Sequence, residues 1–134
     1  MKLRSGIIRH EEGATVVELA FALPILIAML WMIIQLGMVF RAMSGIHHAL
    51  GEGARAATIW PVPEKTAIVA KMNSAVWGIG PGKFSVSTPV DGTADGSTFM
   101  DLQVNYEQKT NLLLFPGPTV KVSRSKRVWV AEAS

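Results

Sequence analysis

The run from Leu19 to Phe40 has 22 residues and no charged side chain. As an α-helix that rises about 1.5 Å per residue, it would be roughly 33 Å long, close to the hydrocarbon thickness of a bilayer, about 30 Å. This length and polarity are typical of a transmembrane helix and argue against a purely soluble protein. We therefore predict a transmembrane helix over residues 14–40.

Residues 1–13 form a short polar leader in front of this helix, and it is basic at Lys2, Arg4 and Arg9. A secretory signal peptide would have an apolar region of about 7 to 15 residues followed by a small-residue cleavage site. The apolar run here is longer, although Ala42-Met43-Ser44 could imitate such a site. A cleavable secretory signal is therefore one alternative to a retained membrane helix.

The distribution of basic residues predicts how the helix is oriented in the membrane. Three basic side chains and the initial amine precede the run, whereas Arg41 and Arg55 follow it. Basic flanks are retained in the cytoplasm, so this bias favours a cytoplasmic N-terminus. We expect a single-pass protein of the inner (cytoplasmic) membrane, with residues from about 42 onward extracytoplasmic, or periplasmic where a second membrane exists.

The helical pattern continues beyond the membrane segment and predicts an amphipathic stem helix over residues 41–60. Apolar residues recur there at steps of three and four, at Met43, Ile46, Leu50, Ala54 and Ala57. Three glycines inside this stretch, Gly45, Gly51 and Gly53, predict a thin or bent stem. The prolines of Trp60-Pro61-Val62-Pro63 then end the helix.

Residues 61–134 are predicted to form a small extracytoplasmic head of the α+β class. A short helix is expected over residues 64–77, and strands over 83–90, 98–109 and 119–130, which gives a two- to three-stranded antiparallel sheet packed on the stem. The second strand alternates most clearly, and its apolar side should be buried. That side carries Met100, Leu102, Val104 and Tyr106, and Val120, Val122, Val128 and Val130 follow the same period in the last strand.

Glu18 is the one ionisable residue at the start of the membrane segment. A carboxylate in the middle of a membrane helix costs about 2.5 to 3.5 kcal/mol, so Glu18 should lie near an interface or meet a positive charge. The simpler interpretation is that it reaches the interface. The other is that cleavage after Gly13 makes Ala14 the first residue and Glu18 the fifth, so that the new α-amine of a neighbouring subunit neutralises Glu18 during assembly.

A basic leader that ends in glycine, a glutamate fifth after it and an apolar helix starting there resemble the class III signal of the type IV pilin superfamily. Within that superfamily, residues 13–42 are similar to the TadE-like pilins of tight adherence (Tad) pili. The similarity includes the pairs Val17-Glu18 and Leu23-Pro24, the later Gln35-Leu36-Gly37, and the Arg41 that follows.

This resemblance implies a prepilin that a membrane prepilin peptidase cleaves between Gly13 and Ala14. It also implies a minor pilin or pseudopilin that takes part in assembly of a Tad (Flp-type) pilus used in adherence. Its partners would be that peptidase, other Tad pilins, the pilus assembly platform and the membrane, with Glu18 as the assembly contact. The major pilins of such systems are much shorter, so the long C-terminal region favours the minor role.

Three residues of the membrane segment are candidates for a kink or for helix packing. Pro24 frees a backbone carbonyl and predicts a kink, which transmembrane helices tolerate. Gln35 could form hydrogen bonds across helices, while Gly37 and Ala28 would allow a second helix to approach closely. For Gln35, a lipid-facing position near the far interface is an equally open interpretation.

Residue types that carry chemistry are sparse, so we expect no enzyme activity, no cofactor and no metal. The chain has no cysteine, and its only histidines are His10 in the leader and the adjacent pair His47-His48, which cannot chelate one ion from a helix. The net charge of +3 is small and spread along the chain, so no nucleic-acid partner is expected. Two alternatives to the pilin remain: a permanently anchored extracytoplasmic binding or sensor module, and a type II secretion pseudopilin.

Overall fold

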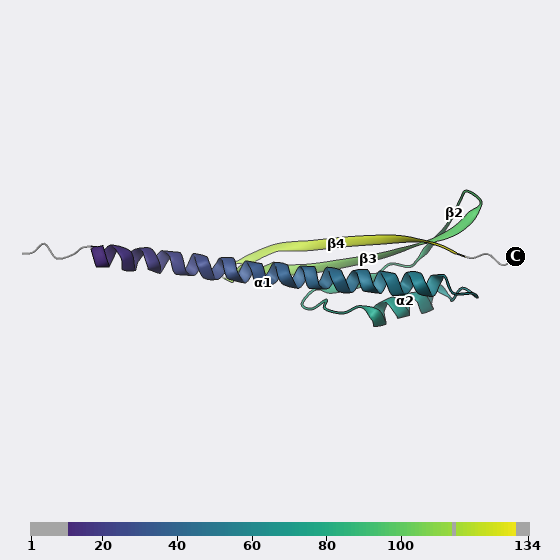
Figure 1. Cartoon of the computed structure of the whole chain (residues 1–134), viewed down its shortest axis with the longest axis horizontal. Helices are drawn as coiled ribbons and strands as arrows, with labels where there is room; N and C mark the ends of the chain where they lie inside the picture. The colour runs from purple at the N-terminus through teal and green to yellow at the C-terminus, as the bar shows by residue number, and fades with distance from the viewer. Residues whose placement is uncertain (1–10, 114, 131–134) are drawn as a thin grey trace, which may run out of the picture.

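The computed structural model describes residues 11–113 and 115–130, and the leader residues 1–10 lie outside this part of the chain. Two helices and four strands follow each other along the chain, with one long helix running the length of the molecule (Figure 1). They are α1 (Glu11–Ala57), α2 (Lys65–Ala75), β1 (Lys83–Val86), β2 (Val90–Ala94), β3 (Ser97–Asn111) and β4 (Pro116–Trp129). The fold is α+β, as predicted.

Helix α1 is a single element of 47 residues that joins the predicted membrane segment to the predicted stem. Pro24 lies inside it, and the helix continues on both sides. The helix ends at Ala57, three residues before the predicted end at 60. Thr58 closes the last turn, because its N–H and its hydroxyl both donate to the carbonyl of Arg55, at 3.2 and 2.8 Å.

The sheet is antiparallel, and β3 is its central strand. One edge of β3 pairs with β4 from Phe99↔Trp129 to Asn111↔Pro116, and the other edge pairs first with β2 and then with β1. Since β1 and β2 follow each other along the same edge, the sheet has four strands but is three strands wide. Helix α1 packs against β3 and β4, and α2 packs against α1.

The number of strands corrects the prediction of two or three. The stretch expected as one strand over 83–90 is interrupted after Val86, and Val90 begins a separate hairpin strand. The chain between β2 and β3 turns at Asp95 and Gly96, whose φ angles are 52° and 75°. Positive φ at two successive positions suits the tight turn of a β-hairpin, so the residues before it are free to pair with β3.

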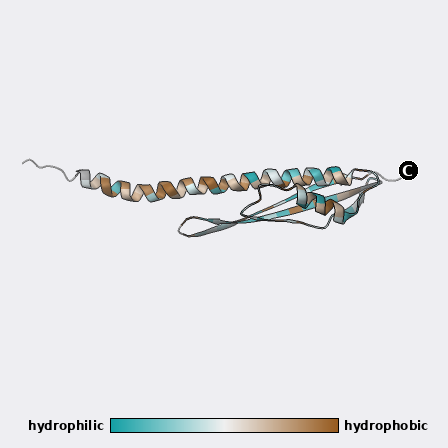
Figure 2. Cartoon of the chain, turned by 90° about the horizontal axis from the view of Figure 1, so that it is seen from below, coloured by the Kyte–Doolittle hydropathy of each residue, from teal (hydrophilic) through white to brown (hydrophobic). Residues whose placement is uncertain are grey.

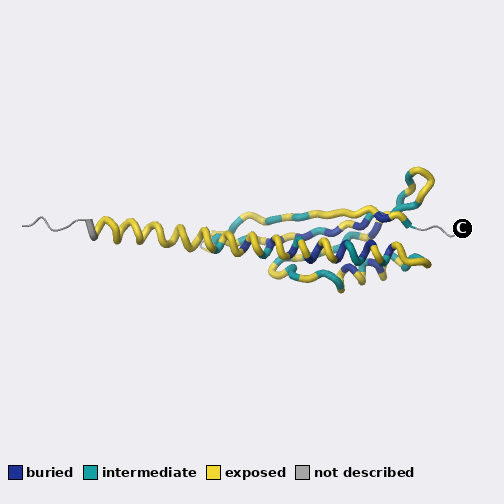
Figure 3. The backbone as a smooth tube through the Cα atoms, viewed as in Figure 1, coloured by how far each residue is buried: buried dark blue, intermediate teal, exposed yellow. Residues whose placement is uncertain are grey.

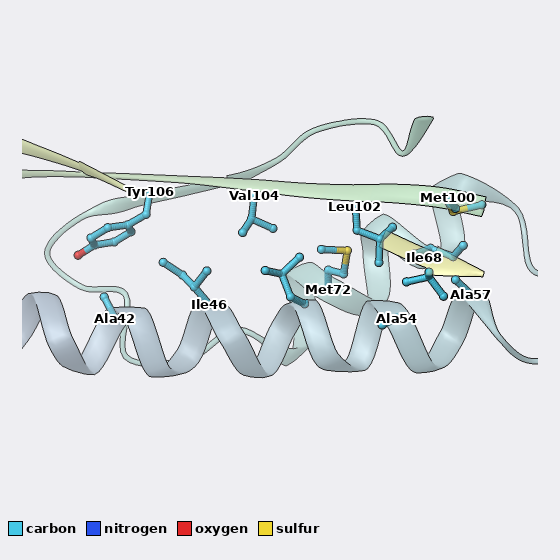
Figure 4. Close-up of a cluster of buried hydrophobic side chains, with 12 residues drawn as sticks. Ala42, Ile46, Ala54, Ala57, Ile68, Met72, Met100, Leu102, Val104 and Tyr106 are labelled. Carbon is cyan, nitrogen blue, oxygen red and sulfur yellow. The ribbon is translucent and has the colours of Figure 1, made fainter. Parts of the chain in front are cut away.

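The core lies between one face of α1, the inner face of β3 and the buried side of α2 (Figure 4). The alternation in β3 is confirmed, because Met100, Leu102, Val104 and Tyr106 are all buried. Helix α2 contributes its two buried residues, Ile68 and Met72. Helix α1 contributes Ala42, Ile46, Leu50, Ala54 and Ala57, which include four of the five predicted stem positions; the fifth, Met43, is half-buried.

Two of the stem glycines allow other parts of the head to lie close to α1, which runs unbroken through them. A Cβ atom added at Gly45 would come within 1.8 Å of the backbone oxygen of Trp77, and one added at Gly53 within 2.5 Å of the Met72 side chain. Gly51, by contrast, has nothing within 4 Å of such an atom. Gly45 and Gly53 therefore determine how tightly the segment from α2 to Trp77 packs on the helix.

Candidate membrane and assembly site

The N-terminal part of α1 extends beyond the head as a bare helix. Every residue from 13 to 30 is exposed, and this stretch is the most hydrophobic part of the helix (Figures 2 and 3). In the part of the chain that the structure describes, the helical stretch Gly13–Ala57 is the one long and apolar enough to cross a membrane. A helix that is apolar all round and uncovered needs lipid or other helices around it.

Glu18 is the one charged residue between Gly13 and Phe40, and it lies on the exposed part of α1. The predicted cleavage junction is one helical turn before it. Both Gly13 and Ala14 are exposed, and a Cβ atom added at Gly13 would have nothing within 4 Å. Since residues i and i+4 of a helix share a face, an amine created at Ala14 would lie on the same side of α1 as the Glu18 carboxylate.

The three residues expected to kink or pack the membrane helix have different surroundings. The side-chain amide of Gln35 is 5% exposed and forms its hydrogen bonds inside the chain, with the backbone of Asn111. Gly37 is exposed, with nothing within 4 Å of an added Cβ atom, so its face of α1 is open to another helix. Pro24 and Ala28 lie together in a groove beside the turn that joins β3 to β4.

That turn reaches the membrane segment of α1, which was not predicted. The indole N–H of Trp31 donates to the carbonyl oxygen of Asn111 at 2.8 Å, and the Asn111 N–H donates to Oε1 of Gln35 at 2.9 Å. An apolar groove of about 600 Å³ lies next to these contacts. Its lining consists of Pro24, Ile25, Ala28, Met29, Met32, Ile33, Leu112 and Phe115.

The sequence did contain a signal for this contact. Residues 110–120 carry no charged side chain, whereas Lys109 and Lys121 flank them directly. A wholly uncharged, largely apolar turn at the end of a hairpin is unusual on a surface that faces water. The signal was missed because strand periodicity says nothing about where the end of a hairpin lies relative to a distant helix.

On the outer face of the sheet, Arg127 of β4 lies opposite Asp101 of β3. Arg127 donates two hydrogen bonds of 2.8 Å to the carboxylate of Asp101, and its guanidinium lies 3.7 Å from the centre of the Phe99 ring. This hydrogen-bonded pairing lowers the pKa of Asp101 and raises that of Arg127. His47 and His48 are exposed, and the described residues include no cluster of three potential metal ligands.

No curated protein and no solved structure matches the chain. Residues 13–55, about a third of the chain, match the family model described as TadE-like protein. The matched residues include the bare apolar helix, Glu18, Gln35 and most of the stem that packs against the head. Over residues 13–55 the chain is therefore similar to TadE-like proteins.

Proposed function

We propose that this chain is a minor pilin or pseudopilin that takes part in assembly of a Tad (Flp-type) pilus used in adherence. The observation that carries the proposal is the exposed apolar helix: every residue from 13 to 30 is exposed, whereas one face of the same helix is buried by the head from Gln35 onward. Such a helix is stable in lipid and can exchange lipid for the helices of neighbouring subunits. The match to the TadE-like family covers this same region.

In this proposal a prepilin peptidase cleaves the chain between Gly13 and Ala14, before assembly. The exposure of both residues supports access to the bond, and a glycine lowers the cost of unwinding the helix there by about 1 kcal/mol relative to alanine. The new α-amine and Glu18 then give each subunit one positive and one negative group at the same end of the apolar helix. Pairing of unlike groups between subunits would fix the register in which the helices pack.

The head lies outside the inner membrane and the leader lies in the cytoplasm, as the basic leader favours. Its partners are the peptidase, other Tad pilins and the assembly platform, and after assembly it is associated with the pilus. The role is structural, without catalysis or a cofactor. The filled apolar core between α1, α2 and β3 supports a rigid head that moves as one body with the helix.

The processing step is tested by the intact mass of the membrane-extracted chain, with and without a co-expressed prepilin peptidase. We expect a peptidase-dependent product that begins at Ala14. Retention of Met1 in both samples would contradict the proposal and favour a permanently anchored binding or sensor module. A product that begins near Gly45 would instead identify a cleavable secretory signal.

The assembly contact is tested by Glu18→Gln, which removes the charge at nearly constant shape. We expect the variant to be cleaved and inserted normally but to be recovered less with other pilins of the system. Asp95→Asn is the matched control, because Asp95 is an exposed carboxylate in the turn between β2 and β3, at the opposite end of β3 from the contacts with the membrane helix. Equal recovery of Glu18→Gln and the control would exclude the assembly role of Glu18.

A further inference from the structure

We propose that the β3–β4 turn enters the outer leaflet of the bilayer, with the side chains of Leu113 and Phe115 among the lipid acyl chains beside α1. This inference rests on the proposal that α1 crosses a membrane, and it goes beyond it, because it places part of the head inside the bilayer. Leu113 and Phe115 are 48% and 68% exposed, so both are free to contact lipid.

The depth of the turn follows from its partners on the helix. Leu112 and Phe115 line the groove with helix residues from Pro24 to Ile33. If the bilayer core ends at Phe40, then Trp31 lies roughly 14 Å below that boundary, at about 1.5 Å per residue. If the core begins as early as Ala14, a thickness of about 30 Å still reaches to residue 34. In both cases the groove lies inside the hydrocarbon region.

In lipid, backbone polar groups need partners within the protein, and several described groups of the turn have them. The N–H of Asn111 donates to Gln35, the N–H of Leu112 to the carbonyl of Phe115 at 2.8 Å, and the N–H of Leu113 to Oδ1 of Asn111 at 2.8 Å. The carbonyl of Asn111 accepts from Trp31. On the other side of the turn, Pro116 and Pro118 have no N–H to satisfy.

Leu113 has a conformation that glycine or asparagine would adopt more easily. Its φ angle is 71°, in the left-handed region, where a bulky side chain is strained. The strained conformation does not bury the Leu113 side chain in the head, since about half of it is exposed. A large apolar side chain at a strained, exposed position is explained if it contacts something outside the chain.

The charges next to the turn identify that contact as a lipid bilayer. Lys109 and Lys121 are exposed and lie on the two strands directly above the apolar turn. At about 3.3 Å per residue, Lys109 is roughly 10 Å from Leu112, so its ammonium group can reach the level of lipid phosphates while Leu112 lies among acyl chains.

The absence of cysteine from the chain allows one fluorescent label to be placed at a chosen position. The full chain is reconstituted in phosphatidylcholine–phosphatidylglycerol vesicles as Leu113→Cys, labelled with a polarity-sensitive dye. Quenching by nitroxides on the acyl chains is compared with quenching by iodide in water. Two controls carry the same dye: Ile27→Cys in the middle of the membrane segment, and Thr93→Cys, exposed at the far end of the sheet.

The expected result is that the labels at 113 and 27 are quenched by the acyl-chain nitroxides several-fold more than the label at 93, which iodide quenches. Quenching of the label at 113 by iodide, with the label at 27 still quenched from lipid, would overturn the insertion of the turn and leave the membrane span intact. A label at 113 that neither quencher reaches would also overturn it and indicate a protein contact, such as a second copy. Loss of lipid quenching at 27 would overturn the span and the insertion together.

A second variant tests the contribution of the side chain without disturbing the fold. In Leu113→Asn, the new residue tolerates a positive φ angle and is polar. We expect the head to remain folded, while a label at Phe115→Cys in the same chain becomes less accessible to the acyl-chain nitroxides and more accessible to iodide. Unchanged quenching at position 115 would contradict the proposed insertion.

Discussion

Gln35 and Asn111 are 76 residues apart in the chain, yet the side-chain amide of the first bonds to both backbone polar groups of the second. This pair joins the membrane helix to the end of the head that carries the β3–β4 turn. It fixes where the β3–β4 hairpin lies along α1, because an amide that accepts from the N–H and donates to the carbonyl of one residue allows a single register. The head is therefore attached to α1 at a defined height as well as through its core.

Gln35→Leu should detach the end of the hairpin from the helix. It leaves the backbone N–H of Asn111 without an acceptor in a part-buried position, which costs about 1 to 3 kcal/mol of unfolding free energy. Amide hydrogen exchange at Asn111 should become faster, and thermal unfolding in detergent should shift to a lower temperature. Ile34→Ala is the control, because Ile34 is the exposed neighbour on the same helix. An equal loss of thermal stability in both variants would argue against the stabilising role of the Gln35–Asn111 hydrogen bonds.

Gly45→Ala and Gly51→Ala should have opposite effects although both place alanine in the same helix. The new methyl group at 45 would overlap the backbone oxygen of Trp77, and such overpacking costs about 1 to 3 kcal/mol. The methyl group at 51 meets nothing, so the higher helix propensity of alanine should stabilise the chain by about 1 kcal/mol. Denaturant unfolding of the two variants in parallel measures the difference, and the same sign for both would contradict the packing described here.

Asp101 should make the stability of the head depend on pH in the acid range. Its hydrogen bonds to Arg127 lower the folded-state pKa below the ordinary value of 3.8, so the folded state binds a proton less readily than the unfolded state. The stabilisation is thus present above that value and is lost as the pH falls through the lowered pKa. Asp101→Asn should show a smaller fall in melting temperature between neutral and acid pH. A carboxyl titration by NMR that gives an ordinary pKa would contradict this.

Tyr106 should make stability depend on pH at the alkaline end. Burial raises the pKa of its phenol, whose hydroxyl donates to Oε1 of Gln108 at 2.6 Å. A folded pKa above the unfolded value means that this stabilisation is present at pH below about 10 and is lost as the pH rises through the raised pKa. The chain has a single tyrosine, so tyrosinate absorbance reports it directly. The native chain should titrate at higher pH than the chain in denaturant; equal titrations would refute the effect.

Tyr106→Phe supplies the matching stability measurement. The variant removes the hydroxyl but keeps the ring in the core, so we expect a loss of about 1 kcal/mol of unfolding free energy at neutral pH. It should also lack the alkaline loss of stability that the native chain shows. If the unfolding free energies of the native chain and the variant fell equally at alkaline pH, another titrating group would be responsible.

The amino-acid sequence alone determined those features that depend on local periodicity. The uncharged run before Arg41 predicts a helix of bilayer length, and the alternation from Met100 to Tyr106 predicts which face of β3 is buried. The apolar steps after Phe40 likewise predict the face of the stem that enters the core. These features follow from the period of each element, so a single stretch of sequence is sufficient to determine them.

Only the tertiary structure decided the features that depend on contacts between residues far apart in the sequence. The β2 hairpin depends on pairing with β3, the room at Gly45 is filled by Trp77, and Gln35 finds its partner in Asn111. None of these contacts leaves a periodic signal, because each joins residues distant in sequence through the path of the whole fold. The sequence thus determined the membrane helix and the core face of the head, and the fold decided how the head meets that helix.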